Sequence, residues 1–187
     1  MLISPVQKPV TNHFKGRGIW KPDCIVIHIA EGLRDSVYSE FLNNPKSTHY
    51  LVNKDGSVWQ FVQEEDAAWG NGIVHNPTSG LVQQRPGVNP NLYTISIEHE
   101  GFAAQGDMSE LMYATSIQLV KDIAGRWNIP LDSVHVIRHR NITDQKSCPG
   151  PINVERIIDG AVASGPTAKQ LVLEIEERVV KLKAMLS

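Results

Sequence analysis

Long apolar runs and an excess of one charge are both absent from this chain. No stretch approaches the about 18 consecutive apolar residues of a membrane-spanning helix, so we expect no membrane insertion. The 18 basic and 20 acidic residues nearly cancel, which argues against nucleic acid as a partner. The first residues lack the basic and apolar regions of a signal peptide, so we expect the protein to accumulate in the cytoplasm.

Cysteine is scarce, with only Cys24 and Cys148. A disulfide between them is one interpretation, but a cytoplasmic chain keeps its thiols reduced. Cys24 opens an apolar segment, where we expect a small buried residue. Cys148 is then free to serve as a metal thiolate.

Alternating strand and helix patterns predict an α/β fold with a central mixed β-sheet flanked by helices. A hairpin is expected over 47–62, around an Asp-Gly turn, and a helix over 35–44 is expected to be capped by Asp35 or Ser36. The stretch 63–92 is rich in Gly and Pro, and an irregular loop of this length is usually functional. The remaining expected strands are 23–32, 94–101 and 133–139, and the remaining expected helices of the main domain are 108–129 and 153–162.

A second, smaller unit is expected after the main domain of residues 1–162. Residues 163–187 contain the Gly165-Pro166 break and then an amphipathic C-terminal helix. Its apolar residues have the spacing of a short coiled-coil seam, namely Val172, Ile175, Val179, Leu182 and Leu186. The seam is expected either to dock on the core or to form a homo-oligomer.

Three residues form a candidate metal site: His28, His139 and Cys148. Each histidine ends an apolar strand, and Cys148 lies in a Cys-Pro-Gly segment shortly after His139. His135 is the competitor, but it lies about 13 Å along the strand from His139, so both cannot bind one ion. The other histidines of the expected strands and loops, His13, His75 and His99, are expected to be structural or solvated.

This ligand set favours zinc, which binds imidazole nitrogen and thiolate sulfur. Three protein ligands leave one position of a tetrahedral ion open. Zinc lowers the pKa of a water at that position to about 7, which predicts a hydrolase.

Five segments, in this order, resemble a known family: IVIHIAEG, STHYLVNKDGSVWQFV, AAWGNG, TISIEHEG and VIRHRNITDQKSCPGP. The family is the zinc N-acetylmuramoyl-L-alanine amidases, shared by phage endolysins, bacterial cell-wall amidases and animal peptidoglycan recognition proteins. The resemblance covers about residues 20–160. It implies a zinc cleft on one face of the central sheet, with His28, His139 and Cys148 as the ligands.

The resemblance also implies two catalytic residues. Glu98 matches the general base at the end of the family's IxIE strand, and Glu100 on the same strand face is its rival. Lys146 matches a lysine that stabilises the oxyanion, and in an extended Lys-Ser-Cys segment its side chain points the same way as Cys148. The alternative interpretations are a solvated strand glutamate and a surface lysine.

The expected substrate contacts are Thr48, His49, Trp69 and Asn71. Some relatives carry a catalytic tyrosine where this chain has Thr48, and His49 lies near the site in relatives. Many relatives have a histidine in an A-W-H-A-G segment, which here reads Ala68-Trp69-Gly70-Asn71-Gly72. That departure removes the family's histidine contact, while Trp69 is either a cleft wall or a core residue.

The resemblance implies a peptidoglycan hydrolase that cleaves the amide between N-acetylmuramic acid and L-alanine. A phage or prophage endolysin that reaches the cell wall after release is the simplest setting. One alternative is a cytosolic recycling amidase for soluble muropeptides, although such relatives tend to have Asp as third ligand. Another is a non-catalytic peptidoglycan-binding module, although such proteins typically lose the cysteine that this chain keeps.

Overall fold

The computed structural model describes residues 3–106 and 108–163. The expected C-terminal helix, and the self-association expected through it, therefore lie outside the described residues. The described residues belong almost entirely to the first of the two expected units. Within it, no helix is both long and apolar enough to cross a membrane.

A six-stranded mixed sheet forms the centre of the fold, as the sequence predicts. Its order is β1-β5-β4-β7-β3-β8, and β4, β7, β3 and β8 run parallel to one another. The hairpin of β4 and β5 is antiparallel and closes at the Asp55-Gly56 turn, as expected. The strand bounds are Val6–Gln7 for β1, Cys24–Ile27 for β3, Tyr50–Val52 for β4, Val58–Gln60 for β5, Thr94–His99 for β7 and Val136–Arg138 for β8.

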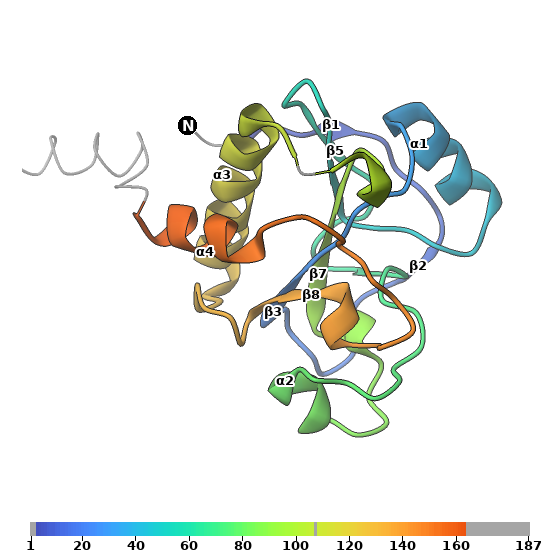
Figure 1. Ribbon diagram of the computed structural model, residues 1–187. Coiled ribbons are helices and arrows are strands. Elements are labelled where there is room, and N and C mark those ends of the chain that lie inside the picture. The colour runs from blue at the N-terminus through green and yellow to red at the C-terminus, as the bar shows by residue number, and fades with distance from the viewer. Residues whose placement is uncertain (1–2, 107, 164–187) are drawn as a thin grey trace, which may run out of the picture.

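Two long helices, α3 (Glu110–Trp127) and α4 (Val154–Ala163), lie side by side on one face of the sheet (Figure 1). The isoleucines of β3 and β7 pack against them, because alternate residues of a strand point to the same face. Cys24 and Val26 point to the other face and pack near α2 (Gly80–Gln83). The side chains of β3 thus alternate between the two faces of the sheet.

The expected cap of α1 (Arg34–Asn43) is wrong. The N-cap residue is Leu33, whose side chain makes no capping hydrogen bond, and Asp35 lies inside the first turn. The backbone N–H of Arg34 instead donates to Oε1 of Glu100, at 3.1 Å. The carboxylate of a residue just after β7 thus satisfies a donor that the local sequence leaves free.

The Gly- and Pro-rich stretch 63–92 is largely irregular, as expected, but it contains short elements. Strand β6 (Ala67–Ala68) pairs with β2 (His13–Phe14) of the N-terminal segment. A 3-10 turn, η1 (Pro90–Leu92), leads into β7. Two further turns are η2 (Ala103–Gln105) and η3 (His139–Asn141).

Candidate metal centre

The site lies at the carboxyl ends of three neighbouring parallel strands. In the register of the sheet, Ile27 of β3 pairs with Ile97 of β7 and with Arg138 of β8. One residue further along the chain come His28 after Ile27, Glu98 after Ile97 and His139 after Arg138. The three side chains therefore meet at one edge of the sheet. Open α/β sheets commonly bind ligands at this edge.

Cys148 reaches the same edge from the segment that follows η3. Its backbone carbonyl accepts from the N–H of Arg140 at 2.9 Å, and its Sγ accepts from the N–H of Ile29 at 3.3 Å. One ligand atom each from His28, His139 and Cys148 lies within 4.8 Å of the other two. The rings of the two histidines are 4.5 Å apart between centroids. The three residues that the sequence singles out are thus close enough to share one ion.

The electrostatics of these three groups suit a cation. Burial lowers the pKa of His28 far below its usual range and also lowers that of His139, so both rings are neutral donors. Burial raises the pKa of the Cys148 thiol, and the nearby Glu98 raises it further. Nε2 of His28 is buried and has no hydrogen-bond partner among the described residues. Two neutral imidazoles and a thiol form a donor set that fits zinc.

Glu98 faces the candidate ligands. Its Oε1 lies 3.9 Å from Nδ1 of His28, and its Oε2 is buried without a hydrogen-bond partner among the described residues. Burial raises the pKa of Glu98 to about 8, while the positive charge of Lys46 acts in the opposite direction. A cation bound beside it would favour the carboxylate form of Glu98, whose free oxygen could then take up a proton.

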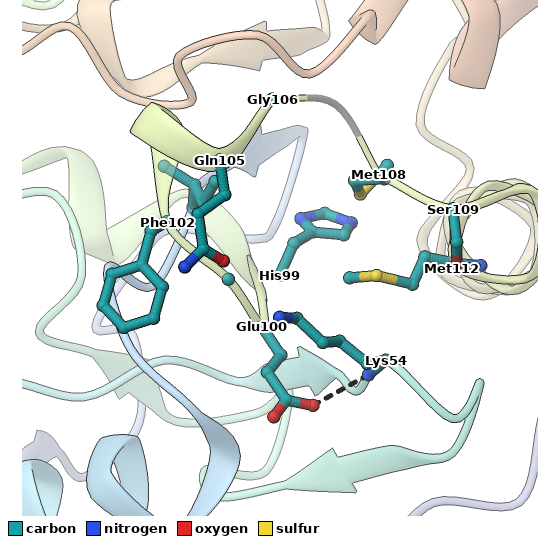
Figure 2. A pocket seen from close by; sticks show the side chains of 11 residues that line it. Lys54, His99, Glu100, Phe102, Gln105, Gly106, Met108, Ser109 and Met112 are labelled. Atoms are coloured by element: carbon teal, nitrogen blue, oxygen red, sulfur yellow. Dashed lines mark hydrogen bonds between the residues drawn. The ribbon is translucent and has the colours of Figure 1, made fainter.

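Glu100, the rival carboxylate, is already engaged in the fold. Figure 2 shows it beside a cavity of about 240 Å³ on the side of the sheet toward α3, with its bond to Lys54 drawn as a dashed line. One carboxylate oxygen accepts from the backbone N–H of Lys54 at 2.8 Å, and the other caps α1 as described above. Glu100 therefore joins the β4–β5 turn to α1.

Lys146 is exposed near the candidate ligands. Burial lowers the pKa of His139, and the positive charge of Lys146 lowers it further. The same charge acts against the burial that raises the pKa of Cys148. Because the side chain is exposed, its ammonium can approach a bound group from the solvent side.

Thr48 and His49 are fully buried beneath this edge. The Thr48 hydroxyl donates to the carbonyl of Ser96 at 2.9 Å. Nδ1 of His49 accepts from the N–H of Ser96 at 3.0 Å, and its Nε2 lies 2.9 Å from the Arg17 guanidinium. Both side chains bond to β7 and are shielded from solvent. A substrate could reach them only if the surrounding residues moved, so their contact with a substrate stays a prediction.

Trp69 and Asn71 have different surroundings. Trp69 is half-buried, and its ring lies 5.4 Å from that of Phe14 between centroids. Asn71 is fully buried, and its carbonyl oxygen lies 3.0 Å from Nε2 of His139. Trp69 can still wall a cleft, whereas Asn71 sits directly behind a candidate ligand.

Lys46 is a residue of the site that the sequence does not reveal: its charge acts on Glu98, and both residues line a small cavity beside α1. No local motif marks this lysine, because its position near Glu98 depends on how α1 folds back to β4. The three histidines expected to be structural or solvated have other partners: His13 with Asp66, His75 with Asp144 and His99 with Ser116. His135, the competing ligand of the sequence analysis, pairs with Asp132.

Comparison with known proteins gives consistent matches. Residues 20–151 match the N-acetylmuramoyl-L-alanine amidase family. N-acetylmuramoyl-L-alanine amidase A of Achromobacter lyticus is 32% identical over 128 residues, which is 59% of this chain and 63% of that protein. The amidase AmiD of Escherichia coli is 28% identical over 142 residues, which is 68% of this chain and 49% of that protein.

Solved structures support the same fold. A crystal structure of an AmpD derivative aligns with a TM-score of 0.68 at 18% identity, covering 86% of this chain and 99% of that one. The structure of Escherichia coli AmiD in complex with anhydro-N-acetylmuramic acid-L-Ala-D-gamma-Glu-L-Lys aligns with a TM-score of 0.63 at 25% identity. That alignment covers 81% of this chain and 62% of the AmiD chain.

Proposed function

Since the chain belongs to the N-acetylmuramoyl-L-alanine amidase family, we propose that it is a zinc-dependent hydrolase of peptidoglycan. The bond cleaved is the amide between the lactyl group of N-acetylmuramic acid and L-alanine of the stem peptide. The observation that carries the proposal is the convergence of ligand atoms from His28, His139 and Cys148 within 4.8 Å at the carboxyl edge of the sheet.

Zinc bound there would polarise the amide carbonyl and lower the pKa of a coordinated water. His28 and His139 would each donate one neutral ring nitrogen, and Cys148 would donate its thiolate after losing a proton. The hydrogen bond from Ile29 to Sγ of Cys148 supports the charged form of the sulfur.

Glu98 would take the proton from the attacking water and pass it to the leaving alanine nitrogen. Its free Oε2 supports this role, as does its position beside His28. The positive charge of Lys46 favours the carboxylate form that accepts the proton. Because an amine leaves poorly as an anion, proton delivery to nitrogen is needed as well as attack on carbon.

Lys146 would stabilise the negative charge that develops on the amide oxygen. Its side chain is exposed, and its ammonium acts electrostatically on His139 and Cys148, which supports a place near the reacting carbonyl. Trp69 would contribute an apolar surface to the cleft.

Two settings are compatible with this chemistry. The first is an endolysin that accumulates in the cytoplasm and acts on the wall after release. The second is an amidase for soluble anhydro-muropeptides, which the similarity to the AmiD complex with such a ligand supports. The matches span less than two thirds of the length of either curated relative, so the substrate of the whole protein is part of the proposal.

The apolar seam in 163–187 adds a proposal about assembly. Its spacing supports self-association, which would raise affinity for a repetitive wall through avidity. Light scattering on the full chain and on a chain ending at Gly165 tests it. A concentration-dependent dimer of the full chain alone is expected, and two monomers would contradict it.

Digestion of purified sacculi and of soluble anhydro-muropeptides, with mass analysis of the products, tests the function. New peptides with N-terminal alanine and sugars with free lactyl groups are expected. New reducing sugar ends without new peptides that begin with alanine would contradict the proposal. The faster substrate distinguishes the two settings.

A further inference from the structure

Asn71 lies behind both histidines of the candidate metal centre. It is fully buried, and its carbonyl oxygen lies 3.0 Å from Nε2 of His139. This contact occupies Nε2 of His139 and leaves Nδ1 for a metal. On the other ring, Nδ1 of His28 faces Glu98 at the cleft, which turns Nε2 inward.

Two buried atoms at this point lack hydrogen-bond partners among the described residues. They are Nε2 of His28 and Oδ1 of Asn71. The side chain of Asn71 interacts with that of His28, whose ring lies 4.5 Å between centroids from the His139 ring that Asn71 also contacts. If Nε2 of His28 carries the proton, Oδ1 of Asn71 can accept a hydrogen bond from it, while the backbone carbonyl of Asn71 accepts from His139.

Two further hydrogen bonds fix the position of Asn71. Its backbone N–H donates to Oδ1 of Asn91 at 3.0 Å, and its side-chain Nδ2 donates to the hydroxyl of Thr94 at 2.8 Å. The bond to Thr94 orients the amide so that Oδ1 is the atom left to accept. The preceding residue, Gly70, allows close approach to the sheet, because a Cβ there would lie 2.8 Å from Oγ of Ser96.

We propose that Asn71 is a positioning residue that orients both histidine ligands, His139 through its carbonyl and His28 through its side-chain oxygen. Each ring then donates Nε2–H to Asn71 and presents Nδ1 to the ion. Outer partners of this kind fix the tautomer and angle of a ligand ring before the metal arrives. The inference rests on the proposed metal centre and assigns Asn71 a role other than the substrate contact expected from the sequence.

Zinc affinity, measured by competition with a chromophoric chelator, tests the proposed contact between the Asn71 side chain and His28. We expect Asn71→Ala to weaken zinc binding by about 10–100-fold, the usual effect of losing an outer-shell partner. Asn71→Asp should bind zinc tightly, because it keeps Oδ1 and the Thr94 hydroxyl can turn to donate to the new oxygen. The matched control is Asn53→Ala, another fully buried asparagine, whose amide donates to Ser57 in the β-hairpin and not to the site.

Equal zinc affinity in wild type, folded Asn71→Ala and Asn53→Ala would overturn the proposal. Loss of affinity in Asn53→Ala equal to that in Asn71→Ala would also overturn it, because a general loss of stability would then explain both. If wild type itself binds no zinc, the metal centre fails and not merely the role of Asn71.

A second measurement does not depend on any variant folding. Long-range proton–nitrogen NMR spectra of the wild-type protein loaded with zinc report which nitrogen of each histidine carries a proton. We expect a protonated Nε2 and a metal-bound Nδ1 in both His28 and His139. Coordination of His28 through Nε2 would overturn the proposal whatever the affinities show.

Discussion

Glu98 and Glu100 show how two carboxylates on one strand acquire different roles. The sequence leaves both open as the general base, because alternate residues share a strand face. In the structure Glu100 accepts two backbone N–H bonds, whereas one oxygen of Glu98 has no hydrogen-bond partner among the described residues. Only partners distant in sequence, at Arg34 and Lys54, make this distinction, so local patterns could not predict it.

The two glutamates give a matched pair of variants. Glu98→Gln should retain zinc but lower kcat by about 100-fold or more, the usual cost of a lost general base. Glu100→Gln keeps one acceptor oxygen, so it should lose some stability while kcat stays near wild type. Turnover of a muropeptide and zinc content are measured on the same samples. The opposite pattern would assign the base to Glu100.

Gly70 illustrates a residue whose importance the sequence does not reveal. A Cβ there would lie 2.8 Å from Oγ of Ser96 and 3.2 Å from the carbonyl of Ser47. Gly70→Ala should therefore lower the free energy of unfolding by about 1–3 kcal/mol through overpacking. Gly125→Ala is the control, because nothing lies within 4 Å of a Cβ at that helical position. Denaturant unfolding that gives both variants equal stability would contradict this account of the contact.

At the scale of elements, hydrophobic periodicity predicted the strands and helices well. The isoleucine rows of β3 and β7 and the long apolar face of α3 carry strong patterns, and each element lies where the pattern indicates. The cap of α1 was predicted wrongly because the partner of its first N–H is Glu100, the residue that follows β7. Short strands such as β1 and β6 have two residues each, too few for any period to be recognised.

A buried ionic network ties the hairpin to α3 and gives a prediction about pH. Glu64 accepts hydrogen bonds from Tyr50, Arg126 and Trp127, at 2.6–3.0 Å. Burial raises the pKa of Glu64, but these bonds outweigh it and hold the pKa below the ordinary value of 4.5. A depressed pKa stabilises the fold above the unfolded value and ceases to do so as pH falls through the folded value.

Glu64→Gln should therefore cost about 1–3 kcal/mol of unfolding free energy at pH 7, as expected for a broken buried network. The difference from wild type should shrink as the pH falls below about 4.5, where the unfolded wild-type carboxyl takes up its proton. Glu65→Gln, at the exposed neighbouring position, is the control and should change little. A stability difference for Glu64→Gln that is independent of pH would contradict the role of its charge.

At the scale of the whole molecule, the parallel order of β7, β3 and β8 explains why residues far apart in sequence form one site. The sequence predicted the ligand set because each histidine ends an apolar strand and Cys148 follows closely. It could not predict that the irregular stretch 63–92 passes behind the ligands, since that path depends on contacts of Asn71 with Asn91 and Thr94. The carboxyl edge of the sheet and this loop together form the proposed centre.

The most direct test of the central claim is a zinc titration of metal-stripped protein in which bound zinc and release of N-terminal alanine are followed together. We expect no amidase activity without metal, and a rise in activity that ends at one zinc per chain. Cys148→Ser should fail to recover activity at neutral pH, whereas Cys24→Ala, which alters a buried cysteine outside the ligand cluster, should recover it. Full amide hydrolysis by the metal-free protein, or by Cys148→Ser without zinc, would contradict the assignment of a zinc centre to these ligands.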